Sequence, residues 1–168
     1  MNNRIIKVLF VSLMLFAGGI LYAPTASASS AGDFTGVKSV KAVWNITTGS
    51  EKVFIDRMQL IRQTADSLKK RGIKSDFVLV IHGKAAKFVT KTLQGTKFAK
   101  EKVPDMAKAQ TVLKDLGGYG SKIEVCSIAM KRAKIKPSNV QPFAAIQENV
   151  FENLIVLQNK GYAYMPVN

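Results

Sequence analysis

A single cysteine, Cys126, is the residue in this sequence best suited to covalent chemistry. It ends a short strand-like run, residues 123–126, and is followed by Ser127 and a cationic stretch that can form a short helix. A thiol placed between a strand and a helix faces the positive end of the helix, where the thiolate is favoured. Because no second cysteine can pair with Cys126, the pattern predicts a free thiol that can act as a nucleophile.

Two other polar residues also stand at the ends of strand-like runs. His82, the only histidine, follows the apolar run 77–81, and Asn45 lies near the end of the run 41–46. Ligands of an open parallel sheet bind beyond the carboxyl ends of its strands, so we expect Asn45, His82 and Cys126 at one edge. An imidazole beside a thiol can generate or stabilise the thiolate, which makes Cys126 and His82 the catalytic candidates. The candidates for ligand binding are Asn45, Gly83 and Ser127.

Each of these residues also has a purely structural interpretation. A lone cysteine is often a small buried apolar residue, His82 can bond the backbone of a loop, and Asn45 can cap the loop that follows it. The sequence has no phosphate-binding glycine loop after a strand, no C-x-x-C pair and no cluster of histidine and acidic residues. We therefore expect no cofactor and no metal.

The elements that must position these residues alternate between strands and helices. We predict strands at 41–46, 77–81, 123–126, 143–146 and 162–165, and helices at 53–71, 84–92, 106–116, directly after Cys126, and from 150 to before Gly161. Gly72 is placed to end the first helix. The lysine-rich stretch 94–104 is predicted to be a surface loop. This order predicts the α/β class, a three-layer α/β/α sandwich with right-handed crossovers.

The N-terminal segment is predicted to serve targeting. Basic residues Arg4 and Lys7 precede the apolar stretch 8–22, and a small-x-small triplet ends at Ala28, the expected cleavage site. A membrane anchor is the alternative, but the stretch is short for a span of about 20 residues. We expect a signal peptide at 1–28, a tail at 29–39 and a domain at 40–168, in a periplasmic or secreted protein with no stable membrane span after cleavage.

The net charge of +14 comes mostly from scattered lysines. Such a charge often indicates a nucleic-acid partner. Here the basic residues have no interleaved aromatic residues and no recognition motif, and export argues against nucleic acid. The remaining interpretations are a solvated cationic surface or an attraction for anions, including sulfur oxyanions and anionic lipid.

Three segments together resemble the DsrE/DsrF-like (DsrE/DsrF/DrsH-like) sulfur-relay family. They are 122–126, the pair His82 and Gly83, and 157–164, and the resemblance spans roughly residues 40–166. It implies a flavodoxin-like fold with a mostly parallel five-stranded sheet. It also implies homo- or hetero-oligomers, as trimers and hexamers, and a persulfide carried by the cysteine that corresponds to Cys126. For this chain we expect a homo-oligomer, a trimer or hexamer.

Two functional hypotheses follow. In the first, an exported sulfur carrier or sulfurtransferase-like protein takes sulfur onto Cys126 from a donor protein or a small sulfane-sulfur species, and an acceptor removes it. In the second, the same fold is a non-catalytic oligomeric module for ligand binding or interaction, and Cys126 is packing. Relay members work in the cytoplasm, so the partners of an exported chain differ from theirs. The hypotheses differ in whether the native thiol reacts.

Overall fold

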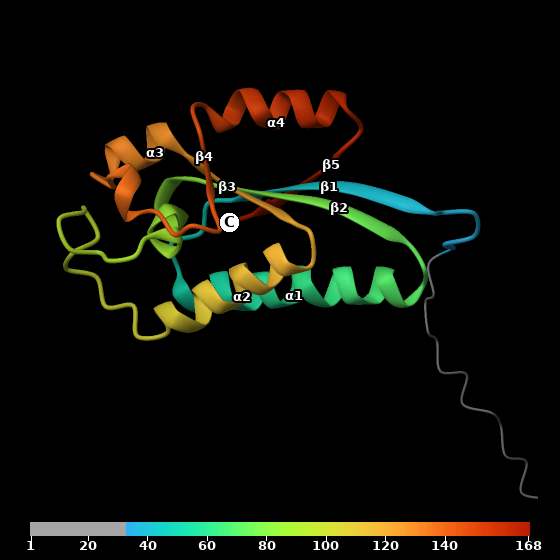
Figure 1. Cartoon of the computed structure of the whole chain (residues 1–168), viewed down its shortest axis with the longest axis horizontal. Coiled ribbons are helices and arrows are strands. Elements are labelled where there is room, and N and C mark those ends of the chain that lie inside the picture. The colour runs from blue at the N-terminus through green and yellow to red at the C-terminus, as the bar shows by residue number, and fades with distance from the viewer. Residues whose placement is uncertain (1–32) are drawn as a thin grey trace, which may run out of the picture. The chain divides into compact units, whose positions relative to one another are not determined.

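Short apolar runs form the central sheet of the computed structural model, which describes residues 33–168 (Figure 1). The strands are β1 (Ser39–Ile46), β2 (Lys74–Ile81), β3 (Lys122–Cys126), β4 (Ala145–Gln147) and β5 (Ala163–Val167). All neighbouring strands are parallel, in the order β4-β3-β2-β1-β5. The run 77–81 is buried throughout, as expected for a central strand that helices cover on both faces.

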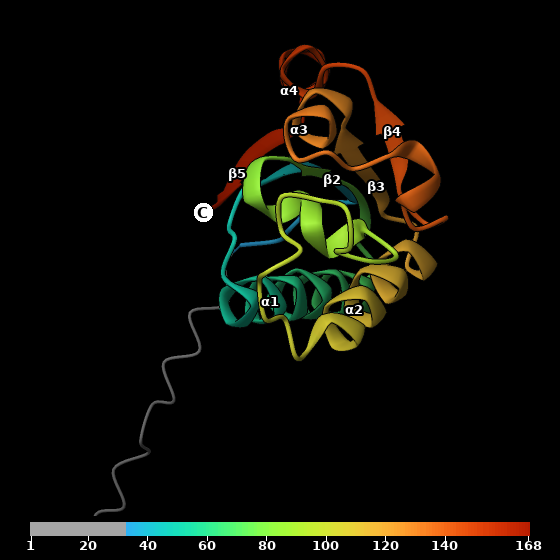
Figure 2. The ribbon, with the colours of Figure 1, turned by 90° about the vertical axis from the view of Figure 1, so that its left-hand side faces the viewer.

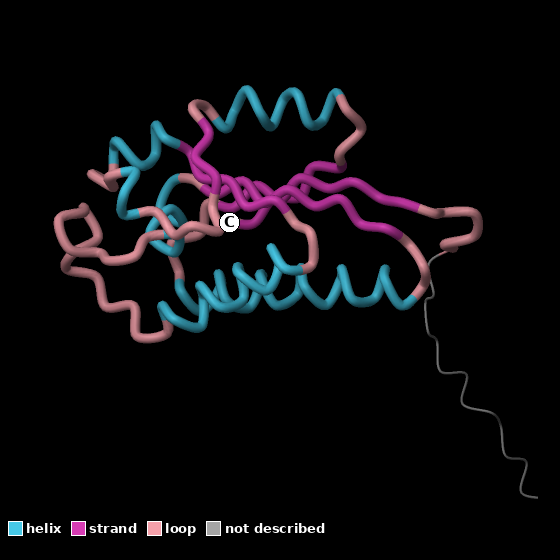
Figure 3. The backbone as a smooth tube through the Cα atoms, in the orientation of Figure 1, coloured by secondary structure: helices cyan, strands magenta, loops and turns pink. Residues whose placement is uncertain are grey.

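Helices cover both faces of the sheet and make it the middle of three layers. The helices α1 (Glu51–Lys70) and α2 (Met106–Gly118) lie on one face, and α3 (Ser127–Arg132) and α4 (Val150–Asn159) lie on the other (Figures 1 and 2). Figure 3 shows the same layering by element type. Two 3-10 helices, η1 (Gly83–Val89) and η2 (Pro137–Asn139), lie in the connections. The predicted three-layer α/β sandwich is confirmed.

The longest helix follows the spacing of its apolar residues. The buried face of α1 includes Phe54, Met58, Ile61, Ala65 and Leu68, which recur at helical spacing. The helix has Ser50 as its N-cap, whose side chain accepts a hydrogen bond from the Val53 amide. It ends before Gly72, whose φ of 73° lies in the left-handed region, as the sequence predicted.

The alternation of side chains along each strand divides the core into two clusters. Leu79, Ile81 and Val125 belong to the cluster that includes the buried faces of α1 and α2. Val80 and Cys126 belong to the second cluster, which includes the buried residues of α4. Because the side-chain period of a strand is two, His82 and Asn45 also fall on the α4 face. The sheet therefore presents Asn45, His82 and Cys126 on the face that α3 and α4 cover.

The expected helix at 84–92 differs from the structure. The segment forms the 3-10 helix η1, which ends at Val89, and Thr90 pairs with Val140 in an isolated antiparallel bridge. The Thr90 hydroxyl donates to the Lys87 carbonyl at 2.7 Å. The pairing of Thr90 with Val140, which is distant in the sequence, holds the chain extended where the sequence suggested another helical turn. The strands β4 and β5 also begin later than predicted.

Residues 35–168 form one compact unit. The predicted signal segment, residues 1–28, and the first residues of the predicted tail lie outside the described residues, so export stays a prediction. From residue 33 onward, no helix is both long enough and apolar enough to span a bilayer.

Candidate functional site

The carboxyl ends of β2 and β3 bring the two catalytic candidates together. Ile81 pairs with Val125 in the parallel register, so the next residues, His82 and Cys126, are neighbours at the edge of the sheet. Both line a pocket of about 270 Å³ at this end of the molecule, the end that faces the viewer in Figure 2. The lining residues are His82, Gly83, Lys84, Lys97, Phe98, Cys126, Ile128, Ala129, Arg132, Ala133 and Phe151.

The Cys126 thiol is free, as predicted, and only 2% of the residue is exposed. The residue ends β3 and stands at the N-cap position of the short helix α3, where its side chain makes no capping hydrogen bond. It packs in the apolar cluster beneath α4 and also forms part of the pocket wall. Access from bulk solvent therefore has to pass through the pocket.

The His82 ring is held by a row of hydrogen bonds that crosses three strands. Its Nε2 lies 2.7 Å from the Asn45 Oδ1, and the Asn45 amide donates to the Tyr164 hydroxyl at 2.7 Å. Since the Asn45 oxygen can only accept, Nε2 carries the proton in the neutral ring and Nδ1 is left as an acceptor. Partial burial lowers the pKa of His82 from its ordinary value of 6.5. The lowered pKa favours the neutral imidazole.

The five sequence candidates occupy different positions around the pocket. Cys126, His82 and Gly83 line it, and Gly83 adopts a φ of 58° that lets η1 start directly after β2. Asn45 is buried and bonds His82. The Ser127 hydroxyl donates to the Glu148 carbonyl at 3.2 Å, and Ser127 is not among the residues that line the pocket. Among the described residues, no hydrogen bond joins the His82 imidazole to the Cys126 thiol.

Cations surround the pocket, and sequence analysis did not select them as a group. Lys84, Lys97 and Arg132 line it from three different segments, and all three are exposed. None of the pocket's described lining residues is an aspartate or a glutamate. Scattered lysines give no spacing signal, so only the fold could show that these charges converge.

The lysine-rich loop 94–104 forms one wall of the pocket. It contributes Lys97, whose backbone amide donates to the Ala133 carbonyl at 2.9 Å, and Phe98, which is buried. Glu101 anchors the loop through an ion pair of 2.5 Å with the buried Lys87. The one aromatic residue in a polar stretch was the available signal that this loop packs against the domain.

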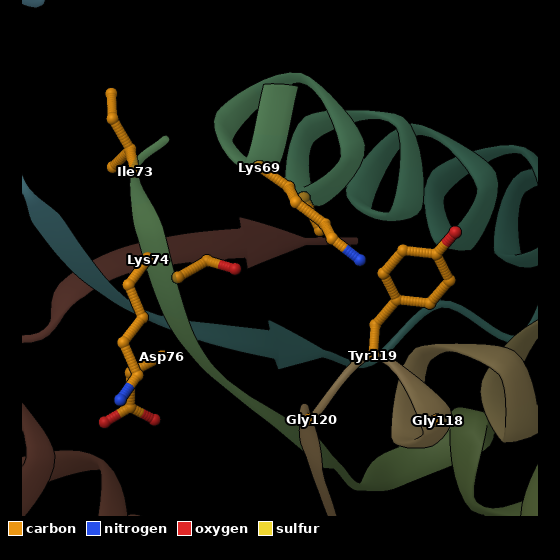
Figure 4. Close-up of a pocket in the computed structure, with 9 residues that line it drawn as sticks. Lys69, Ile73, Lys74, Asp76, Gly118, Tyr119 and Gly120 are labelled. Carbon is orange, nitrogen blue, oxygen red and sulfur yellow. The ribbon is translucent and has the colours of Figure 1, made fainter. Parts of the chain in front are cut away.

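The larger pocket lies at the opposite end of the sheet (Figure 4). It measures about 600 Å³, and its lining residues are Ala65, Lys69, Ile73, Lys74, Ser75, Asp76, Gly118, Tyr119 and Gly120. Lys69 extends toward the Tyr119 ring, with 5.8 Å from its Nζ to the ring centroid. Asp76 accepts a hydrogen bond of 2.6 Å from Tyr162, which raises the pKa of Tyr162 to about 12. No cysteine or histidine is among its described lining residues.

A metal centre finds no support in the arrangement of ligands. Histidine, cysteine, aspartate and glutamate form no group of three or more within residues 33–168 that could hold a metal ion. The polar and reactive groups that line the Cys126 pocket are a thiol, an imidazole and three cations.

Comparison with known proteins assigns the family. A sequence profile of the DsrE/DsrF-like family matches residues 41–167, most of the chain. The chain belongs to the DsrE/DsrF-like family. The resemblance seen in the sequence is thereby confirmed.

Two relatives bear on fold and length. An uncharacterized protein of Aquifex aeolicus (strain VF5) is 36% identical over 128 residues, which are 76% of this chain and 56% of that protein. The chain thus spans little more than half of that relative's length. A protein of unknown function from Methanobacterium thermoautotrophicum, MTH1491, superposes with a TM-score of 0.59 over 77% of this chain and 98% of its own, at 12% identity. This likeness shows the shared fold.

Proposed function

We propose that this protein is a sulfur carrier or sulfurtransferase-like protein that holds sulfur as a persulfide on Cys126. The observation that carries the proposal is the position of a free thiol on the wall of a cationic pocket, next to the only histidine. The thiolate attacks a sulfane sulfur, the S–S bond of the donor breaks, and the rest of the donor leaves with the electron pair. An acceptor nucleophile then attacks the outer sulfur and restores the thiolate.

The surroundings of Cys126 suit an anionic sulfur species. The reacting thiolate and the persulfide are both anions, and Lys84, Lys97 and Arg132 supply positive charge around the pocket. The neutral His82 ring has Nδ1 free of its bond to Asn45, so this nitrogen can accept the thiol proton. Phe98 and Phe151 add apolar surface that limits contact of the persulfide with water.

Mass spectrometry of the native protein after incubation with polysulfide tests this proposal. We expect added mass in units of one sulfur atom on the wild type and none on Cys126→Ser. His82→Ala slows alkylation of the thiol if the imidazole accepts its proton, and leaves the rate unchanged if His82 only ties Asn45 to the sheet edge. A native protein that takes up no sulfur would overturn the carrier proposal.

The burial of Cys126 and the surface of α4 favour a second candidate, a non-catalytic oligomeric module. Phe151, Ile155 and Val156 form an exposed apolar face on α4, and this helix contains no lysine or arginine. In a chain of charge +14, a face without positive charge is the surface on which copies repel each other least.

We propose a homo-oligomer, a trimer or a multiple of one, that assembles through α4; light scattering should show it. Ile155→Glu should shift the protein to monomer, with Glu152→Gln as the control that leaves the apolar face intact. A wild-type monomer at micromolar concentration would contradict assembly.

We also propose that the protein acts outside the cytoplasm, on the basis of the segment 1–28. Its sulfur donor and acceptor would then be periplasmic or extracellular. N-terminal sequencing should show that the exported form starts near Ser29. An intact Met1 in a membrane fraction would refute export.

A further inference from the structure

The Cys126 pocket has cations on its exposed side, which we call its mouth, and a buried thiol. The side chains of Lys84, Lys97 and Arg132 are exposed, whereas Cys126 is only 2% exposed. The apolar residues Phe98 and Ala133, which also line the pocket, are both buried. The pocket thus combines three exposed cations with buried apolar residues and a buried thiol.

The size of the pocket limits what can enter. Its volume of about 270 Å³ lies just below the range of about 300–1,000 Å³ that is typical of small-molecule sites. The walls come from the end of β3, from His82 and the start of η1, from the loop 94–104, from α3 with the residue that follows it, and from α4. A backbone hydrogen bond from Lys97 to Ala133 joins the loop to the end of α3. A folded donor protein would have to open these walls to bring its own persulfide to Cys126, whereas a small donor needs no opening.

One wall of the mouth depends on a close backbone approach. A Cβ added to Gly49 would lie 2.7 Å from the Cβ and 3.0 Å from the Cδ of Lys84. Gly49 thus leaves the space in which the Lys84 stem packs beside the pocket. The close packing against Gly49 thus fixes the stem of Lys84, while the residue stays exposed.

From these features we infer that the immediate sulfur donor is a small S-sulfonate anion of the thiosulfate type. This inference rests on the proposed function of Cys126. Such a donor has a group for each part of the pocket: its oxyanion group would lie among the exposed cations, and its terminal sulfane sulfur would reach the buried thiol. Polysulfide lacks the oxyanion end, and a persulfidated protein is too large to enter the pocket.

The reaction balances without an added oxidant or reductant. The Cys126 thiolate attacks the terminal sulfur of thiosulfate, a new S–S bond forms, and the S–S bond of thiosulfate breaks. Sulfite leaves with that electron pair, from the mouth of the pocket where Lys84, Lys97 and Arg132 stabilise its charge. One thiolate and one thiosulfate dianion thus give one persulfide anion and one sulfite dianion.

Calorimetry of thiosulfate binding to the full-length Cys126→Ser protein tests the inference, because this variant binds without reacting. We expect saturable binding that weakens about two- to fivefold with Lys97→Gln and again with Arg132→Gln, the range for exposed ion pairs. Lys69→Gln and Lys74→Gln, which remove the same charge from the larger pocket, should leave binding unchanged.

The outcomes separate this inference from the carrier proposal. If thiosulfate does not bind, or if Lys74→Gln weakens binding as much as Arg132→Gln, the S-sulfonate inference is wrong. Polysulfide can still add sulfur to wild-type Cys126 in that case, and the carrier proposal stands. If thiosulfate binds as expected but neither thiosulfate nor polysulfide adds sulfur to the wild type, the carrier proposal is wrong.

Discussion

The two ends of the sheet carry pockets of opposite character. The pocket at the amino end of β2 has more than twice the volume of the Cys126 pocket, and it too contains lysines. Its polar groups, however, serve the fold: Asp76 bonds Tyr162, and Lys69 lies over the Tyr119 ring. The smaller pocket holds the thiol and the imidazole, together with cations that form no ion pair within residues 33–168.

This difference follows from the direction of the strands. In a parallel sheet the strands all end at one edge, so residues that directly follow them meet there, as His82 and Cys126 do. At the opposite edge, the ends of α1 and α2 meet the start of β2. Strand direction, more than pocket volume, decides where this fold can bring reactive side chains together.

Substitutions that fill one pocket or the other should produce the largest difference in the alkylation rate of Cys126. Ala129→Leu adds volume beside Cys126, and we expect the alkylation rate of the native thiol to fall at least about tenfold because the reagent loses access. Ser75→Leu is the matched change in the larger pocket and should leave the rate unchanged. Thermal unfolding of both variants checks that the fold is retained. Equal loss in both would mean that the Cys126 pocket is not the path to the thiol.

Asn45→Asp should produce an intermediate effect, a change in the pKa of His82. The carboxylate would lie where Oδ1 now accepts from Nε2, so it should favour the charged ring and raise the pKa of His82. His82 is the only histidine, and NMR titration therefore reports it without ambiguity. An unchanged pKa would show that the bond to Asn45 does not control this ring.

The sign of the wild-type effect on stability follows from the lowered pKa of His82. As the pH falls below 6.5, the unfolded chain takes up a proton before the folded chain does, so this group decreases the free energy of unfolding. Asn45→Asp should reverse that trend over the same pH range. Chemical denaturation at pH 7 and below measures it.

Tyr162→Phe should have the smallest effect on the thiol. It removes the hydrogen bond to Asp76 and should lower the free energy of unfolding by about 1.5–3 kcal/mol, as for a bond to a charged group. The alkylation rate of Cys126 should stay at the wild-type value, which chemical denaturation and alkylation together would show. A slower thiol would mean that the two ends of the sheet are coupled.

Much of the fold could be predicted from the sequence because its signals are local. The apolar spacing of α1, the position of Gly72 and the strand-to-helix change at Cys126 all depend on residues close together in the chain. The pocket could be predicted only in part, because its walls depend on distant contacts. Lys97 bonds the backbone of Ala133, and no spacing rule connects them. The early end of η1 has the same origin, since Thr90 pairs with Val140.

The most direct test compares alkylation of native Cys126 by iodoacetate and by iodoacetamide, reagents of similar size that differ in charge. If the thiol lies at the floor of a cationic pocket, both reagents react, and the ratio of the iodoacetate rate to the iodoacetamide rate is higher for the native protein than for the chain in urea. Arg132→Gln should lower that ratio. A thiol that resists both reagents until the protein unfolds would contradict the account, because Cys126 would then be core packing.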